Sequence, residues 1–130
     1  MKYYHLLLLA TVLCFAACKS AVSPQDLYGK WKYTRVRNPN ASPPDSVGNM
    51  TLLEQKPYIQ FTDKDSLIIN WDSKVLSHGT FTIYGPNIRY KEILATGLRE
   101  FPFYIEKFDG KQLIFSTKGA DGSEVTAIKE

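Results

Sequence analysis

The feature that most constrains this chain is the alternation of apolar and polar side chains within short runs bounded by turn residues. Trp31 and Tyr33 alternate with lysines near the start of the pattern. Further along, Phe101, Phe103 and Ile105 alternate with Pro102, Tyr104 and Glu106. A period of two is typical of β-strands with one buried face. Because we find no amphipathic helix of useful length beside these runs, the sequence predicts an all-β protein.

Eight segments share this pattern and are rich in β-branched and aromatic residues, with Asp, Gly, Pro and Ser between them. They are Gly29–Arg37, Tyr58–Thr62, Ser66–Trp71, Val75–Tyr84, Asn87–Ile93, Phe101–Lys107, Lys111–Thr117 and Glu124–Lys129. Sequential strands of this kind can form an up-and-down sheet that closes on itself and leaves no exposed edge. We therefore predict a small eight-stranded antiparallel barrel. A two-sheet β-sandwich of the same strands is the alternative.

Four other segments complete the expected fold. Pro24–Tyr28 could form one helical turn ahead of the first strand, and Asp109-Gly110 is a strong hairpin signal. Asn38–Asn49 contains prolines and small polar residues and is the one long connection. Met50–Gln55 fits either a short strand or a loop.

The N-terminus has the build of a secretory signal, with Lys2 ahead of the uncharged run Leu6–Ala17. That run is shorter than the roughly 20 residues that a bilayer-spanning helix needs. Phe15-Ala16-Ala17-Cys18 places two small side chains before a cysteine and resembles the lipobox of bacterial lipoproteins. Cys14 fits less well because bulky Val12 and Leu13 precede it. An ordinary secretory signal, cut near Ala17 or Ala21, is the alternative.

The lipobox resemblance implies that Cys18 carries acyl chains such as palmitate and anchors the protein to a membrane. Two such chains suffice for stable anchoring. The predicted domains are therefore a signal peptide over residues 1–17, a lipidated tether over 18–25 and a barrel over 26–130. Lys19-Ser20 after the cysteine, by resemblance to Gram-negative lipoproteins, suggests the outer membrane with the barrel facing the periplasm. Removal of the signal would leave one cysteine and hence no internal disulfide.

Composition argues against several classes of function. The net charge is only +3 and basic residues are interspersed with acidic ones, so we expect no nucleic-acid partner. His78 is the one histidine outside the predicted signal peptide, and an exposed or edge-strand position explains it better than a catalytic role. Asp63 and Asp65 lack the further ligands of a calcium loop. We predict no enzyme activity, no metal site and no cofactor.

Leu27-Tyr28-Gly29-Lys30-Trp31 resembles the G-x-W opening of the lipocalin family. The wider pattern is similar to small lipocalin-like domains of bacterial lipoproteins, in Phe61-Thr62-Asp63, in Gly79–Ile83 and in the hairpin Asp109–Leu113. The resemblance covers Asp26 to Glu130. It implies that Gly29 and Trp31 belong to a plug at one end of a barrel.

Two family features are missing. There is no T-D-Y motif between the sixth and seventh strands. The arginine that lies over the tryptophan from the last strand is also absent, and Lys129 is its nearby cationic substitute.

With the first strand starting at the plugged end, alternation beyond Tyr33 points Arg35 and Arg37 inward near the opposite mouth. Asn38–Asn49 would arch over that mouth as a lid. The same reasoning puts apolar residues around the upper interior, namely Ile59, Trp71, Phe101, Phe103 and Phe115. An apolar pocket with cations at its rim suits an amphiphile with an acidic head, such as a fatty acid.

Other interpretations remain open. An eight-stranded barrel is only just wide enough for its own side chains, so the aromatic residues could simply fill it. The arginines could pair with Glu92, or a bulge could turn them to solvent. We therefore expect either a binding module for a small apolar or amphipathic molecule, or a solid barrel that acts as an envelope structural or protein-interaction module. An inhibitor or accessory subunit of a secreted enzyme is a third hypothesis.

Overall fold

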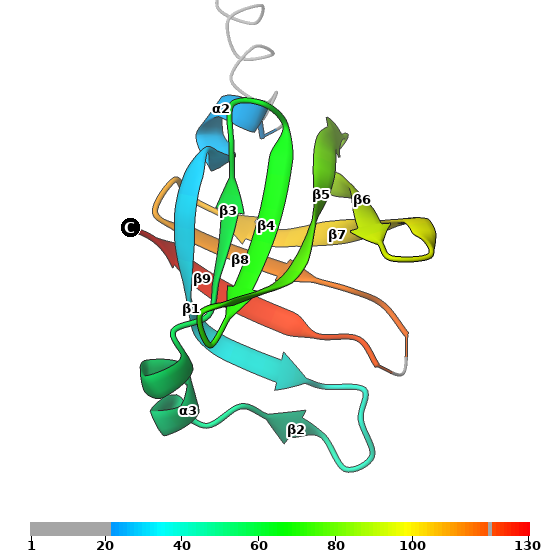
Figure 1. The fold of residues 1–130 in the computed structure, drawn as a ribbon. Coiled ribbons are helices and arrows are strands. Elements are labelled where there is room, and N and C mark those ends of the chain that lie inside the picture. Colours follow the sequence, from blue (N-terminus) through cyan, green and yellow to red (C-terminus); the bar gives the residue numbers. More distant parts are fainter. Residues whose placement is uncertain (1–21, 120) are drawn as a thin grey trace, which may run out of the picture.

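The computed structural model describes residues 22–119 and 121–130, so the predicted signal peptide and Cys18 lie outside the described residues. Strands dominate the described chain, with two short helices (Figure 1). The elements are α2 (Pro24–Leu27), β1 (Gly29–Asn38), β2 (Asp45–Ser46), α3 (Asn49–Gln55), β3 (Tyr58–Phe61), β4 (Ser66–Trp71), β5 (Lys74–Tyr84), β6 (Asn87–Leu94), β7 (Gly97–Phe108), β8 (Gln112–Ser116) and β9 (Glu124–Lys129). No helix among these residues is long and apolar enough to cross a bilayer.

The sheet closes into a barrel. From β3 to β9 each strand pairs antiparallel with the next, and β1 joins the two ends by pairing with β3 on one side and β9 on the other. The eight barrel strands match the eight predicted segments to within one residue at most ends, but β7 begins at Gly97, four residues before the predicted start at Phe101. The prediction of an antiparallel up-and-down barrel is therefore confirmed, and the sandwich alternative is wrong.

One end of the barrel is closed by α2 and Trp31. The predicted helical turn forms as α2, with Ser23 as its N-cap. The indole Nε1–H of Trp31 donates a hydrogen bond of 2.8 Å to the carbonyl oxygen of Leu27, and both side chains are fully buried. Lys129 lies with its Nζ 5.4 Å from the centre of the Trp31 ring, where the family resemblance implied a cationic substitute.

The opposite end holds two elements that the sequence analysis did not predict. Met50–Gln55 belongs to helix α3 and is neither a strand nor a loop. It buries Leu52, and Gln55 accepts a hydrogen bond from the indole of Trp71. The segment Asn38–Asn49 does not form a lid: it turns back through β2, which pairs with the last residues of β1. None of its residues lines the cavity described below.

A β-bulge in β1 corrects the predicted direction of the two arginines. The register with β9 shifts between Tyr33 and Arg35, so two residues of β1 oppose one of β9. Beyond the extra residue, the side chains that regular alternation would point inward point outward, and the others point inward. Val36 therefore faces the interior, with 7% of its surface exposed. Arg35 is exposed, and Arg37 pairs with Glu124 at 2.7 Å. The prediction that both point into the barrel is wrong.

The wall of the barrel separates between β7 and β8 near the mouth. Pairing of these strands ends at Tyr104 and Ser116, so in the described structure Gly97–Phe103 pairs with β6 alone. Figure 1 shows the β6–β7 hairpin diverging from the β8–β9 hairpin at this point. Pro102 suits such a position, because a residue without an N–H is tolerated on an unpaired strand edge.

Candidate ligand-binding cavity

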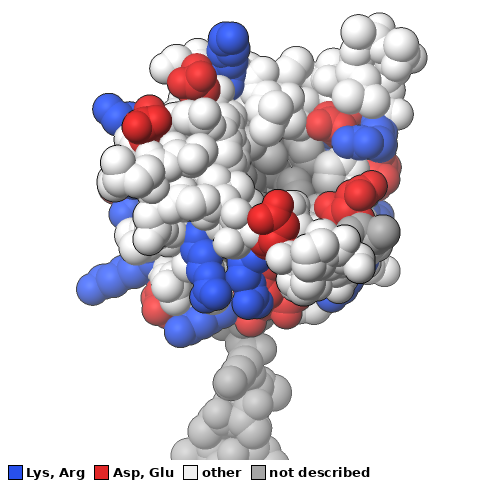
Figure 2. Space-filling model, turned by 90° about the horizontal axis from the view of Figure 1, so that it is seen from below, with Lys and Arg blue, Asp and Glu red and all other residues white. Residues whose placement is uncertain are grey.

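The interior of the barrel near the mouth is a cavity of about 820 Å³. A barrel filled by its own side chains would leave little empty space. The volume of this cavity instead falls within the range of small-molecule sites, roughly 300–1,000 Å³. Figure 2, which looks into the molecule from below, shows the hollow with mainly uncharged walls and charged side chains around its rim. The cavity reaches both the end of the barrel and the gap between β7 and β8, because residues on both sides of that gap line it: Glu100, Pro102, Tyr104, Thr117, Lys118, Asp121 and Ser123.

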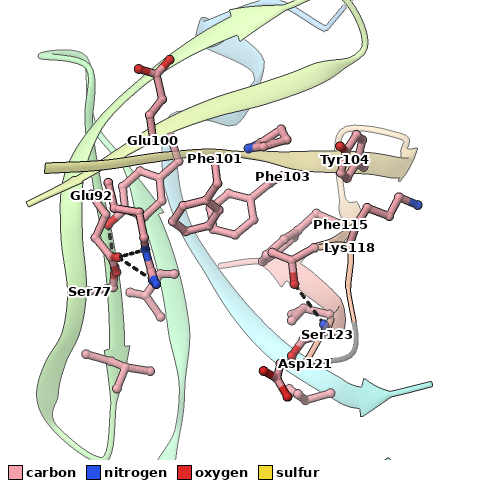
Figure 3. Close-up of a pocket in the computed structure, with 18 of the residues that line it drawn as sticks. Ser77, Glu92, Glu100, Phe101, Phe103, Tyr104, Phe115, Lys118, Asp121 and Ser123 are labelled. Carbon is pink, nitrogen blue, oxygen red and sulfur yellow. Dashed lines mark hydrogen bonds and ion pairs between the residues drawn. The ribbon is translucent and has the colours of Figure 1, made fainter. Parts of the chain in front are cut away.

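Aromatic side chains form the inner wall of the cavity. Phe103 lies at the centre of the group, stacked on Tyr90 with ring centres 5.4 Å apart and edge-on to Phe115 at 5.2 Å. Tyr33 continues the group by contacting the rings of Phe115 and Trp71. Figure 3 shows Phe101, Phe103 and Phe115 side by side in the cavity. Edge-to-face packing is a preferred arrangement of aromatic pairs, and it makes this part of the cavity wall apolar.

A polar network lies on the wall formed by β5, β6 and β7. The side chain of Glu92 is only 9% exposed. Its Oε1 accepts a hydrogen bond from Arg99 Nε at 3.0 Å and lies 2.7 Å from Arg99 Nη2 in an ion pair. Its Oε2 accepts a hydrogen bond from the hydroxyl of Ser77, which also lies 2.7 Å from the hydroxyl of Tyr90. Figure 3 shows this cluster on the side of the cavity away from Lys118 and Asp121.

Antiparallel pairing explains why these groups meet. Glu92 and Arg99 are direct partners across the β6–β7 hairpin, so their side chains lie on the same face. Gly79 faces Glu92 across β5 and β6, and a Cβ at this position would come 1.9 Å from the carbonyl oxygen of Lys91. The missing side chain thus lets β5 and β6 approach closely beside the network.

The two buried tyrosines hold their protons strongly. Burial, together with the neighbouring Tyr90, raises the pKa of the Tyr33 phenol far above its ordinary value of 10.0. Burial also raises the pKa of Tyr90, and the hydrogen bond with Ser77 opposes that shift. Both phenols are therefore neutral hydrogen-bonding groups across the physiological range of pH.

Five of the seven residues predicted to bind a ligand line the cavity, and two do not. Tyr33, Trp71, Phe101, Phe103 and Phe115 come together as expected, although their role in binding stays a prediction. Arg35 and Arg37 lie outside the cavity because of the bulge. Ile59 is fully buried in the core but is not part of the cavity wall.

Sequence reasoning missed Arg99, Ser77 and Tyr90. Arg99 lies in a segment, Gly97–Glu100, without apolar alternation, and it was not assigned to a strand. A tight hairpin between Ile93 and Leu98 pairs Arg99 with Glu92, which the sequence analysis considered only as a partner of Arg35 and Arg37. The signal of the bulge beside Arg35 is that the apolar residues Tyr33 and Val36 are three positions apart, whereas regular alternation would place them an even number apart.

The described residues give no sign of a metal site. They contain no group of three or more His, Cys, Asp or Glu side chains placed to hold an ion. His78 is exposed on β5 and faces away from the cavity wall.

Comparison with solved structures identifies the architecture. The chain superposes on the crystal structure of a lipocalin-like protein from Bacteroides uniformis with a TM-score of 0.55 and 15% sequence identity, over 81% of this chain and 99% of that one. The fold is lipocalin-like. At this identity the likeness concerns the fold alone. No family model and no curated protein matches the sequence.

Proposed function

We propose that this protein is a membrane-anchored, lipocalin-like lipoprotein of the cell envelope that binds a small apolar or amphipathic molecule inside its barrel. The observation that carries the proposal is the open cavity of about 820 Å³ with its aromatic wall. A solid barrel acting through its outer face, the alternative from the sequence, would have a filled interior. We propose a binding role and no catalytic one.

The surroundings of the mouth support an apolar guest. Leu76 lines the cavity and is 66% exposed, and Leu98 is equally exposed on the adjacent hairpin. Large apolar side chains held open to water at a cavity entrance are typical of binding sites for apolar molecules. An acidic head group, which the sequence analysis expected from Arg35 and Arg37, loses its basis because neither arginine lines the cavity.

The anchoring part of the proposal comes from the residues before the barrel. Cys18 follows two alanines and lies six residues before Pro24, the first residue of α2. Because α2 covers the closed end, a lipid on Cys18 would hold that end near the membrane. The mouth would then open on the opposite side of the barrel, toward the periplasm if the anchor is in the outer membrane.

Native mass spectrometry tests the binding function. The chain from residue 19 onward contains the whole closed barrel, and we expect it to retain an added mass that organic extraction removes. Val36→Trp fills part of the cavity and should abolish the added mass. Val75→Trp is the matched control, because Val75 is 59% exposed and does not line the cavity. Equal retention by both variants would contradict the proposal.

A further inference from the structure

We propose that the cavity prefers an amphipathic molecule with an uncharged, hydrogen-bonding head group, such as a hydroxyl or an amide, over one with a carboxylate. This inference rests on the proposed binding function and specifies the chemistry of its ligand. It follows from two observations. The cations of the cavity wall already face carboxylates, and the hydroxyl groups beside them still have hydrogen-bonding capacity.

Arg99 is the one arginine among the described residues that line the cavity, and Glu92 neutralises it. Two nitrogen atoms of Arg99 bind the same carboxylate oxygen, so the pair carries no net charge. Lys118, on the other side of the cavity, lies 3.8 Å from Glu106. A carboxylate head placed between them would find that both cations described in the cavity wall already face a carboxylate, and it would lie near the buried charge of Glu92. Burying an ion without a partner is strongly unfavourable, so this geometry disfavours an anionic ligand.

The hydroxyls of the network have a fixed direction. Ser77 has a single hydroxyl proton and donates it to Glu92, since a carboxylate can only accept. Tyr90 must then donate its own proton to Ser77. The phenol oxygen of Tyr90 therefore has accepting capacity left, although the side chain is fully buried in the cavity wall. A small movement of the ring toward the cavity would offer this oxygen to the O–H or N–H of a neutral head group.

Tyr33 supplies the complementary donor. Its side chain is only 5% exposed and lines the cavity, and its hydroxyl makes no hydrogen bond with a described residue. The hydroxyl is not among the buried polar atoms without a partner, so it faces the space of the cavity and its proton is available to an acceptor there. The oxygen of a hydroxyl or amide head can accept this proton. A head group that accepts from Tyr33 and, once the Tyr90 ring moves toward the cavity, donates to Tyr90 would bind both hydroxyls.

Competition binding tests the preference. The probe is N-phenyl-1-naphthylamine, an uncharged fluorophore, and the competitors are 1-dodecanol and dodecanoate at neutral pH, which differ only in the head group. We expect the alcohol to displace the probe at a concentration about tenfold or more below that of the acid. A factor of this size corresponds to one hydrogen bond that the bound acid fails to form away from water. Tyr33→Phe should weaken the alcohol by about 3- to 10-fold.

Glu92→Gln gives the sharper test because it leaves Arg99 without its counter-charge. The relative affinity should then shift toward dodecanoate by about tenfold or more. Glu124→Gln is the matched control: it frees Arg37 in the same way, but outside the cavity. This control should keep the preference of the unaltered chain. Far-ultraviolet circular dichroism establishes that each variant is folded, and if Glu92→Gln is not, Arg99→Gln should instead weaken dodecanoate further.

The outcomes separate the two proposals. Equal or tighter binding of dodecanoate by the unaltered chain overturns the inference and leaves the binding function standing. The same holds if Glu124→Gln shifts the preference as much as Glu92→Gln. Failure of the fluorophore and of both competitors to bind overturns the proposed function, and the inference with it.

Discussion

The indole nitrogen of Trp31 and the carbonyl oxygen of Leu27 are 2.8 Å apart, and this hydrogen bond joins α2 to the closed end of the barrel. Trp31 is fully buried and also contacts the ring of Phe108, with ring centres 6.0 Å apart. The plug thus combines a large packed side chain with a satisfied polar group.

Trp31→Ala should lower the free energy of unfolding by about 3–5 kcal/mol, because it leaves a cavity and removes the hydrogen bond. Trp31→Phe keeps most of the volume and should have a clearly smaller effect. Urea unfolding followed by circular dichroism measures both. A loss below about 1 kcal/mol for the alanine variant would show that the closed end is not built around this residue.

Arg35→Ala combined with Arg37→Ala should leave ligand binding unchanged, because both side chains lie on the outer face. The stability change should stay within about 1 kcal/mol, since the pair of Arg37 with Glu124 is partly exposed. Titration with N-phenyl-1-naphthylamine measures the affinity. A large loss of affinity in the double variant would mean that the bulge between Tyr33 and Arg35 is not present in solution.

Stability should fall as the pH rises above about 10, because the pKa values of Tyr33 and Tyr90 are raised in the folded state. In the unfolded chain these phenols lose their protons near 10.0, whereas the folded protein holds them to a higher pH. The stabilisation is therefore complete below pH 10 and declines above it. Unfolding by urea between pH 8 and 11 measures the slope.

Tyr33→Phe should flatten this alkaline decline, and Tyr84→Phe is the control because Tyr84 is 65% exposed. An identical decline in both variants would show that the buried phenol does not link stability to pH.

Gly79→Ala should destabilise the barrel by about 1–3 kcal/mol, because the added methyl group would overlap the backbone of Lys91. Separation of β5 from β6 would also disturb the contact between Ser77 and Glu92. Gly48→Ala is the control, since no atom lies within 4 Å of a Cβ built there. Thermal unfolding compares the two. If both variants melt at the temperature of the unaltered chain, β5 and β6 are not as close as described.

The barrel could be predicted because each of its strands after the first pairs with its neighbour in the sequence, so local alternation and turn residues define most of the topology. The course of the chain after Asn38 could not be predicted this way. Helix α3 is short and depends on tertiary contacts, through buried Leu52 and through Gln55, which binds Trp71. Propensity alone gives little information about a helix of this length.

The apolar half of the site followed from the sequence, and the polar half did not. Inward residues such as Phe101 and Phe103 keep a regular phase along β7. The polar network instead depends on a residue pair across a hairpin, and the outward direction of Arg35 and Arg37 depends on a bulge that changes the phase of β1. Both are matters of register, which a single strand pattern does not define.

Titration of the barrel with N-phenyl-1-naphthylamine tests the central claim most directly, at a protein concentration well above the dissociation constant. A usable cavity predicts a rise in fluorescence that saturates at one probe molecule per chain, and Val36→Trp should lose this saturable signal while Val75→Trp keeps it. A signal that rises without saturation, or that Val36→Trp leaves intact, would contradict binding inside the barrel.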